Sequence, residues 1–436
     1  MKELRIGILG FGVVGRGVAE LLLTQGALLT QRTGVVLRLV RIATRTPGRD
    51  RGLDLGSVAL TGDVQQVVAA DDIDVVVELI GGLDPARGLV LEALGRGKHV
   101  VTANKALIAT CGAEVMSRAA AMGCELLFEA AVAGAIPAIK VLRESLVANR
   151  IDQIYGILNG TCNYILTEMR EKGVSFAQVL QDAQAKGFAE ADPSFDVDGI
   201  DAAHKLAILA AIAFGSLPRF EQIHIEGIRH VSAVDIQWAS EMGYRIKLLG
   251  IAKQDAEGVE LRVQPTLVPA TGMVASVEGV FNAVFIRGDA AGTTMYYGRG
   301  AGERPTASAV VADLVDIARN GRVGNLQRVA AFSTLPEHLA TFPVRQTDEW
   351  KGEYYLRLAV ADRPGVLAEV TTVLARQRIS IDAIHQKGRS AVAAVPLIMV
   401  THETTEQQVR AALAEMEQLA CVRETPRFIR IEPGFV

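Results

Sequence analysis

The sequence predicts an α/β protein built from three units, and three observations support this prediction. A short apolar strand from Leu4 to Leu9 runs into a glycine-rich turn and a helix, as in parallel sheets covered by helices. Strand patterns dominate from Arg245 to Gly288, which predicts a second, α+β unit with an open sheet. From Lys351 onward, about 80 residues follow the order β-α-β-β-α-β.

Changes of pattern along the chain place the expected boundaries. The expected units are 1–138, with helix 305–320 packing back on it, then 139–304, an irregular linker at 321–350, and 351–436. Few core contacts are expected to cross the linker, so truncation near Asp348 is expected to leave an active body.

The composition excludes several classes of function. The chain has 436 residues, of which 22% are charged, and a net charge of −4 without a basic run, so we expect no nucleic-acid partner. The longest apolar runs are too short to span a bilayer, and the N-terminal strand leaves no room for a signal peptide. The scattered cysteines Cys111, Cys124, Cys162 and Cys421 favour a reducing cytoplasm and argue against structural zinc.

The first strand ends in a glycine-rich motif that opens a helix extending to about Leu29. The motif G-x-G-x-x-G comprises Gly10, Phe11, Gly12, Val13, Val14 and Gly15. The glycines permit a tight turn and a close approach of a pyrophosphate to the helix N-terminus. This context predicts a dinucleotide-binding, Rossmann-type unit.

The end of the second predicted strand, Val35 to Ile42, bears on the choice of cofactor. An NAD site usually has an acidic residue there to hold the ribose hydroxyls, whereas this chain has Arg45, with Arg49 and Arg51 beyond. An arginine favours the 2′-phosphate of NADP(H), although NAD(H) remains possible. The alternative is a solvated basic loop.

A later strand of the same sheet, from His99 to Thr102, leads directly to Lys105. Ligands bind at the carboxyl ends of parallel strands, so we expect Lys105 on the nicotinamide side, with a surface lysine as the alternative. A further strand is expected from Glu125 to Ala131.

The helix beginning near Ile200 is the most informative stretch of the second unit. It is apolar from Leu206 to Phe214, yet its first turns carry Asp201 and Lys205, which share one face. The carboxylates that precede this helix are Glu190, Asp192, Asp196 and Asp198. The spacing fits either a helix-dipole aspartate with its paired lysine or an acid–base lysine beside substrate-holding carboxylates.

Motifs in all three units identify a family. The matching segments are G-F-G-V-V-G at 10–15, T-A-N-K-A at 102–106, E-A-A-V-A-G-A-I-P at 129–137, G-I-L-N-G-T-C-N-Y-I at 156–165, G-F-A-E-A-D-P at 187–193, D-G-I-D-A-A-H-K at 198–205 and D-R-P-G-V-L at 362–367. With these segments the chain resembles bacterial homoserine dehydrogenase with a C-terminal ACT domain, in its monofunctional form.

The resemblance implies NAD(P)H-dependent reduction of L-aspartate 4-semialdehyde to L-homoserine, on the route to threonine, methionine and isoleucine. It implies that Lys205 donates the proton to the aldehyde oxygen, and that Asp201 and Glu190 hold the substrate. The remaining implied positions are Gly160 and Thr161 in the substrate loop, Lys105 at the cofactor or substrate, and Gly187 and Gly302 facing the cofactor.

The resemblance also implies a structural site for a monovalent cation, usually sodium. Its ligands would be the Glu129 carboxylate and the carbonyl groups of Val132, Gly134 and Ile136. Ala135 stands where the family often has a second glycine, which matters only if the turn needs a positive φ at that residue.

For the C-terminal unit, the resemblance implies binding of L-threonine as an allosteric inhibitor; a vestigial or purely dimerising unit is the alternative. Pairing of the middle sheet with a copy of itself would give a homodimer, with a homotetramer also open.

Two rival functions remain at this point. An acylating aldehyde dehydrogenase would need an activated cysteine, for which Cys162 is the candidate. A non-catalytic amino-acid sensor would be expected to lack the group of Glu190, Asp201 and Lys205.

Overall fold

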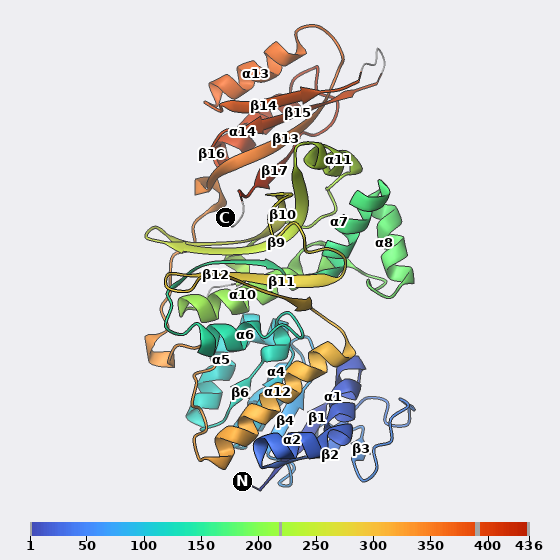
Figure 1. Ribbon diagram of the computed structural model, residues 1–436, viewed down its shortest axis with the longest axis vertical. Coiled ribbons are helices and arrows are strands. Elements are labelled where there is room, and N and C mark those ends of the chain that lie inside the picture. Colours follow the sequence, from blue (N-terminus) through green and yellow to red (C-terminus); the bar gives the residue numbers. More distant parts are fainter. Residues whose placement is uncertain (1, 218–219, 389–392, 434–436) are drawn as a thin grey trace.

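The computed structural model describes residues 2–217, 220–388 and 393–433. Figure 1 shows three parts stacked along the long axis, with the N-terminal sheet at one end and the C-terminal unit at the other. In the described part of the chain, every helix is too short or too polar to cross a membrane.

The N-terminal part is a six-stranded sheet whose neighbouring strands are all parallel, in the order β3-β2-β1-β4-β5-β6. Its elements are β1 (Glu3–Leu9), α1 (Val13–Thr24), α2 (Gly26–Thr33), β2 (Val36–Ala43), β3 (Ala59–Thr61), α3 (Gln65–Val68), β4 (Val75–Glu78), α4 (Ala86–Gly95), β5 (His99–Thr102), α5 (Lys105–Ala121), β6 (Leu126–Leu127) and α6 (Ala138–Lys140). The predicted Rossmann-type sheet is confirmed.

A helix from much later in the chain completes the N-terminal core. Helix α12 (Glu303–Arg322) lies along α1, and its Ala307, Val310 and Leu314 pack with apolar residues of the sheet and of α1. At its first turn, Glu303 forms an ion pair with Arg16 of α1. The N-terminal part of the molecule is therefore built from two separate segments (Figure 1).

Two local predictions for this part are wrong. The helix predicted to reach Leu29 ends at Thr24, and α2 follows as a separate helix. The strand predicted from Glu125 to Ala131 is reduced to β6 and followed by a 3₁₀ turn at Glu129–Ala131. The chain turns there because the backbone and side chain of Glu129 are held by groups outside the sheet.

The middle part places a mixed sheet beside the buried helix α10. Its elements are β7 (Ile151–Ile157), α7 (Gly160–Lys172), α8 (Phe176–Ala185), α9 (Ser194–Val197), α10 (Ile200–Phe214), β8 (His224–Ile225), α11 (Ala233–Glu241), β9 (Tyr244–Asp255), β10 (Gly258–Pro269), β11 (Phe281–Gly288) and β12 (Gly292–Arg299). Strands β12, β11, β7, β9 and β10 are neighbours in this order, so β12 forms one edge.

The C-terminal unit continues the same sheet. Its elements are β13 (Lys351–Val360), α13 (Val366–Arg376), β14 (Ile381–Gln386), β15 (Val395–Thr401), β16 (Thr404–Thr405), α14 (Glu406–Glu417) and β17 (Arg427–Ile431). The predicted β-α-β-β-α-β order is present, with β16 as a short addition. The last strand, β17, pairs on one side with β13 and on the other, in parallel, with β10 of the middle part (Figure 1).

The expectation that few core contacts tie the C-terminal unit to the rest is wrong. Arg262 of β10 is fully buried and forms ion pairs with Glu260 and with Glu432, the residue after β17. Glu432 also accepts hydrogen bonds from Lys253 Nζ at 2.9 Å and from the Tyr155 hydroxyl at 3.0 Å. A chain truncated near Asp348 would lose Glu432 and the rest of β17, so Arg262 would keep Glu260 but lose its second partner.

Candidate active site

The candidate site begins on α10, which is bounded by two glycines in the left-handed region. Gly199 at its N-terminus has a φ of 87°, and Gly215 at its C-terminus has a φ of 61°. Almost all of the helix is buried, including Asp201 and Lys205, which are 3% and 8% exposed. Two ionised side chains in such a place must be paired with each other or with further groups.

The structure brings a second lysine to this pair. Asp201 Oδ2 lies 2.7 Å from Lys205 Nζ, and Asp201 Oδ1 lies 2.9 Å from Lys105 Nζ. Lys205 also donates to the carbonyl oxygen of Leu158 at 2.7 Å. Lys105 is the first residue of α5, so one carboxylate joins a lysine of the N-terminal part to a lysine of the middle part.

The charges of the two lysines govern the protonation of Asp201. Burial by itself would raise the pKa of this carboxyl, but Lys205 and then Lys105 lower it well below its ordinary value. Asp201 is therefore ionised across the accessible pH range. It can hold a lysine ammonium in place but cannot itself act as an acid.

Two further polar residues belong to this group: Asn159, which the sequence did not assign to the site, and Asp196, one of the carboxylates that precede α10. Asn159, the residue before α7, donates to Asp201 Oδ2 and to Asp196 Oδ1, both at 2.8 Å. Burial, followed by the charge of Asp201, raises the pKa of the partly buried Asp196. The only available signal was that Asn159 lies in the same motif as Gly160 and Thr161.

The predicted substrate loop lies next to these groups. Gly160 begins α7, and a Cβ there would come within 2.7 Å of the Val280 carbonyl oxygen, so only glycine fits. The Thr161 hydroxyl donates to the carbonyl oxygen of Phe188 at 2.8 Å. This bond ties α7 to the loop that carries Gly187, whose φ of 74° is left-handed.

Glu190 is placed differently from the other predicted substrate residues. It is exposed, and the hydrogen bond recorded for it joins its backbone carbonyl to Gln184 Nε2 at 3.0 Å. The structure thus brings Asp201, Lys205 and Lys105 into contact and leaves Glu190 exposed. Gly160 and Thr161 directly follow Asn159, which contacts Asp201.

An aromatic layer covers the lysine side of the site, and the sequence did not predict it. Lys105 Nζ lies 5.3 Å from the centre of the Phe195 ring. Phe195 stacks on His204, which in turn stacks on Phe220 with ring centres 4.4 Å apart. Burial lowers the pKa of His204, which keeps this ring neutral beside the two lysines.

The glycine-rich turn has the geometry that a dinucleotide needs. Gly10 has a φ of 102°, and a Cβ there would lie 2.7 Å from the Leu79 carbonyl oxygen. A Cβ on Gly15 would lie 2.2 Å from the Gly10 carbonyl oxygen, whereas Gly12 at the start of α1 has open space around it. The turn is therefore closely packed at Gly10 and Gly15. It is open at Gly12, where a pyrophosphate would approach the helix N-terminus beside Phe11, Val13 and Val14.

Two of the three arginines that follow β2, Arg45 and Arg51, lie in different surroundings. Arg45 is exposed just beyond the strand. Arg51 lies over the Phe11 ring, 4.8 Å from its centre, and donates to the Phe11 carbonyl oxygen at 2.7 Å and to Thr46 Oγ1 at 2.8 Å. Arg51 thus supports the glycine-rich turn, while Arg45 is free to meet a ligand. Gly302, at the start of α12, lies beside the Arg16–Glu303 pair of the same region.

Glu129 lies in a buried cluster with an excess of acidic groups. Its carboxylate accepts the N–H groups of Ile139 and Lys140 at 3.1 and 2.8 Å, and its own N–H donates to Asp313. Burial and the charge of Asp313 raise the pKa of Glu129 to about 8. Lys140 Nζ is 3.7 Å from Asp313 Oδ1, so it offsets only part of this charge.

The turn after Glu129 presents backbone rather than side-chain ligands. Ala133 and Gly134 both have a φ of 55°, whereas Ala135 is outside the positive-φ region, so its side chain does not strain the turn. Val132, Gly134 and Ile136 are buried around it. Among the described residues, three or more His, Cys, Asp or Glu side chains nowhere gather as a metal site, so a cation here would depend on carbonyl oxygens.

Cys162 does not have the environment of a nucleophile. It is fully buried, its thiol donates to the Asp196 carbonyl oxygen, and burial raises its pKa far above the ordinary value. A reactive cysteine needs a lowered pKa and partial exposure. The acylating alternative therefore lacks its nucleophile at this position.

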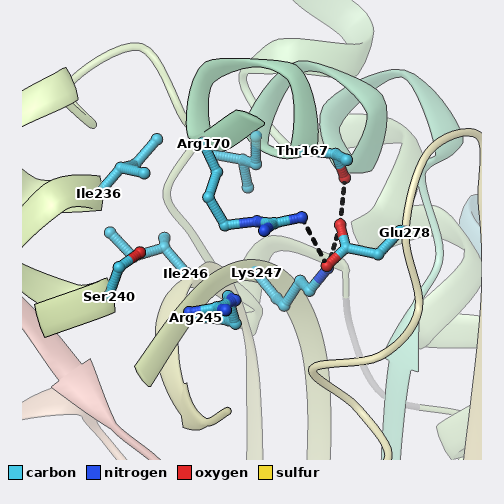
Figure 2. Close-up of a pocket in the computed structure, with 9 residues that line it drawn as sticks. Thr167, Arg170, Ile236, Ser240, Arg245, Ile246, Lys247 and Glu278 are labelled. Carbon is cyan, nitrogen blue, oxygen red and sulfur yellow. Dashed lines mark hydrogen bonds and ion pairs between the residues drawn. The ribbon is translucent and has the colours of Figure 1, made fainter. Parts of the chain in front are cut away.

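A second charged cluster lies outside this site, where α7, α11 and β9 meet (Figure 2). Lys247 is 3% exposed and donates to the Val277 carbonyl oxygen at 2.6 Å, and Glu278 bonds to Thr167 and pairs with Arg170. Burial lowers the pKa of Lys247 to about 8. The cavity measures about 10 Å³, enough for about one water, so the cluster is not a substrate site.

The fold and the first site define a nicotinamide-dependent oxidoreductase with a lysine–aspartate pair. Three family models match the chain: homoserine dehydrogenase, NAD binding domain, over residues 10–129; homoserine dehydrogenase over 137–315; and the ACT domain over 354–421. The chain belongs to the homoserine dehydrogenase family, and it is an oxidoreductase with a C-terminal ACT domain.

Relatives cover the whole chain. Homoserine dehydrogenases of Pseudomonas aeruginosa and Neisseria gonorrhoeae are 48% and 45% identical, each over 99% of both chains. The crystal structure of a homoserine dehydrogenase from Thiobacillus denitrificans is 50% identical, covers 99% of both chains and has a TM-score of 0.93. A hyperthermophilic archaeal homoserine dehydrogenase in complex with NADPH is 28% identical and has a TM-score of 0.62, over 74% of this chain and all of that one.

Proposed function

We propose that this enzyme interconverts L-aspartate 4-semialdehyde and L-homoserine with Lys205 as its acid–base residue, on the route to threonine, methionine and isoleucine. The observation that carries this proposal is the buried Asp201 carboxylate held between Lys205 and Lys105. An aspartate that served only the helix dipole would need at most one lysine partner. It would not need a second lysine from the N-terminal part of the molecule. This arrangement favours the catalytic alternative.

The residues divide the reaction between them. A nicotinamide cofactor held at the turn of Gly10 and Gly12 would supply a hydride for the aldehyde carbon. Lys205 gives its Nζ proton to the developing alkoxide, and in the reverse direction it accepts the hydroxyl proton. Asp201 stays ionised and fixes the direction of this ammonium, while Lys105 offers a second positive charge on the cofactor side. Gly160 and Thr161 border the substrate, and Glu190 would reach it from the rim.

The reaction itself is tested by NADP-dependent oxidation of homoserine at alkaline pH, followed by cofactor absorbance. The same assay after thiol blocking separates the rival function, because a thioester enzyme would be inactivated and a hydride–lysine enzyme would not. Full activity after blocking supports the proposal, whereas its loss without unfolding would support the rival.

We propose NADP(H) as the preferred cofactor. Support comes from the exposed Arg45 beyond β2, where an NAD site would carry an acidic side chain. The structure of the archaeal relative, which is in complex with NADPH, points the same way. Gly187 and Gly302 are proposed to face the cofactor, since one lies beside the substrate loop and the other beside α1.

We propose a sodium-type cation at Glu129 with the carbonyl groups of Val132, Gly134 and Ile136. Two adjacent buried carboxylates, Glu129 and Asp313, face Lys140, which is also shared with Asp316, and this excess of acidic groups fits a hard cation held by oxygen atoms. Its role would be to fix the turn, not to take part in the chemistry.

We propose that L-threonine binds the ACT domain and inhibits the enzyme. Gly365, with a φ of 93°, begins α13 and leaves backbone N–H groups for a carboxylate. Helix α11 offers a connection, since Asp235 accepts from Tyr355 at 3.0 Å and from Arg357 at 2.7 Å on the ACT side. Figure 2 shows Ile236 and Ser240 of the same helix across from Arg170 of α7, whose first residues border the substrate.

We propose that the enzyme forms a homodimer or homotetramer and lies in the cytoplasm. Strand β12 is an edge of the middle sheet, and its Tyr297 is 53% exposed, which supports pairing with a second copy as a homodimer or within a homotetramer. The four cysteines are all free thiols, in keeping with the reducing cytoplasm.

A further inference from the structure

The side chain of Asn159 has an unusual set of partners. Its amide group is buried, and its nitrogen donates both to Asp201 Oδ2 and to Asp196 Oδ1 at 2.8 Å. Its oxygen accepts the backbone N–H of Cys162 at 2.8 Å, which caps α7. One neutral side chain thus contacts two carboxylates and the start of the helix that borders the substrate.

The position of Asn159 also restrains Lys205 from two directions. Lys205 Nζ bonds to the carbonyl oxygen of Leu158, the residue before Asn159, and to the same Asp201 oxygen that Asn159 contacts. Asp201 therefore receives two donors on Oδ2 and Lys105 on Oδ1, which leaves its carboxylate little freedom to rotate. Without the amide, the Asp201 carboxylate could turn and take the Lys205 ammonium with it.

The amide has a second effect on the two acidic groups. Carboxylates accept hydrogen bonds only, and two of them brought close repel each other unless donors lie between them. The two N–H groups of Asn159 supply these donors, one to each carboxylate. A residue that only capped α7 would not need them, because a serine oxygen accepts the helix N–H equally well.

We propose that Asn159 is a positioning residue of this reaction: its amide holds Asp201 in the orientation that aims Lys205 at the substrate carbonyl oxygen. This inference rests on the proposed roles of Asp201 and Lys205. Its effect is exerted through these side chains, so it should alter turnover and leave cofactor binding unchanged.

The test separates positioning from capping by comparing Asn159→Ser with Asn159→Ala. Serine keeps a cap for α7 and removes both amide donors, whereas alanine removes the cap as well. Both variants are expected to lose about tenfold or more in kcat, since small misplacements of a reacting group are costly. The KM for NADPH should stay unchanged, and Asn159→Ala should melt at a lower temperature than Asn159→Ser because it lacks the cap as well as the amide donors. Wild-type kcat in Asn159→Ser would overturn the inference.

Three further measurements distinguish the possible outcomes. Thr405→Ala removes the cap of α14, far from the site, and should lower the melting temperature without changing kcat. Lys205→Ala tests the proposed function. If this variant retains turnover, the proposed role of Lys205 is wrong. If Lys205→Ala loses turnover while Asn159→Ser does not, only the positioning role of Asn159 is wrong. In an Asp201→Asn background, Asn159→Ser should reduce kcat no further, and an additional tenfold loss would show that Asn159 acts independently of Asp201.

Discussion

Replacing Glu432 by glutamine should destabilise the junction between the ACT domain and the rest of the enzyme. The buried Glu432 carboxylate is held by Arg262, Lys253 and the Tyr155 hydroxyl. Burial opposes its ionisation, but Arg262 and Lys253 lower its pKa from 4.5 to about 2. That difference corresponds to about 3 kcal/mol of folding free energy at neutral pH, similar to the cost of breaking other buried ion pairs.

The pH dependence gives this prediction a direction. A carboxyl whose folded pKa is lowered stabilises the fold fully above its unfolded pKa, and this contribution is lost as the pH falls toward the folded pKa. The gap between wild type and Glu432→Gln should therefore be constant around neutral pH and narrow from about pH 4.5 downward.

The measurement is thermal unfolding of both proteins, with Glu114→Gln as a matched control. Glu114 pairs with Arg87 on the surface, so its loss should leave the melting temperature unchanged. For a cooperative unit of about 150–250 residues, the loss at Glu432 predicts a fall of roughly 6–12 °C. Equal melting temperatures for wild type and Glu432→Gln would refute the reasoning.

Three further predictions concern the ligands. Arg45→Ala should raise the KM for NADPH much more than that for NADH, and equal effects on the two cofactors would contradict the preference for NADP(H). Arg51→Ala should weaken the binding of both cofactors, because Arg51 supports the turn at Phe11. The wild type should have a higher melting temperature in sodium chloride than in choline chloride of equal ionic strength, and Glu129→Gln should abolish this difference. If the difference is the same in Glu129→Gln, the cation binds elsewhere. Millimolar threonine should inhibit homoserine oxidation by the wild type but not by Gly365→Val, since a side chain strains the turn at a φ of 93°; an uninhibited wild type would remove the regulatory proposal.

The sequence predicted those features of the site that depend on local spacing. Asp201 and Lys205 are four residues apart on one helix, and their contact follows from helix geometry alone. The turn at Gly10 follows in the same way from its place between a strand and a helix. Both could be found without any knowledge of the tertiary structure.

The remaining features depend on contacts between distant segments. No local pattern indicates that Lys105 reaches Asp201 or that Asn159 lies between two carboxylates, since each contact depends on how the two parts pack. Likewise, alternating strands do not reveal which sheet edge they join, so β17 was not expected beside β10. The charged Arg262 within the apolar strand β10 was the available sign that this strand needed a partner from elsewhere.

The central claim is that Lys205 transfers the proton, and one measurement tests it most directly. Reduction of L-aspartate 4-semialdehyde should be followed for the wild type, for Lys205→Ala and for Lys172→Ala, a surface lysine paired with Glu168. Lys205→Ala should lose at least about a hundredfold in kcat while binding NADPH normally, because the turn at Gly10 is untouched. Lys172→Ala should behave as the wild type. If Lys205→Ala keeps most of its turnover, this lysine only pairs with Asp201 and the account of the active site is contradicted.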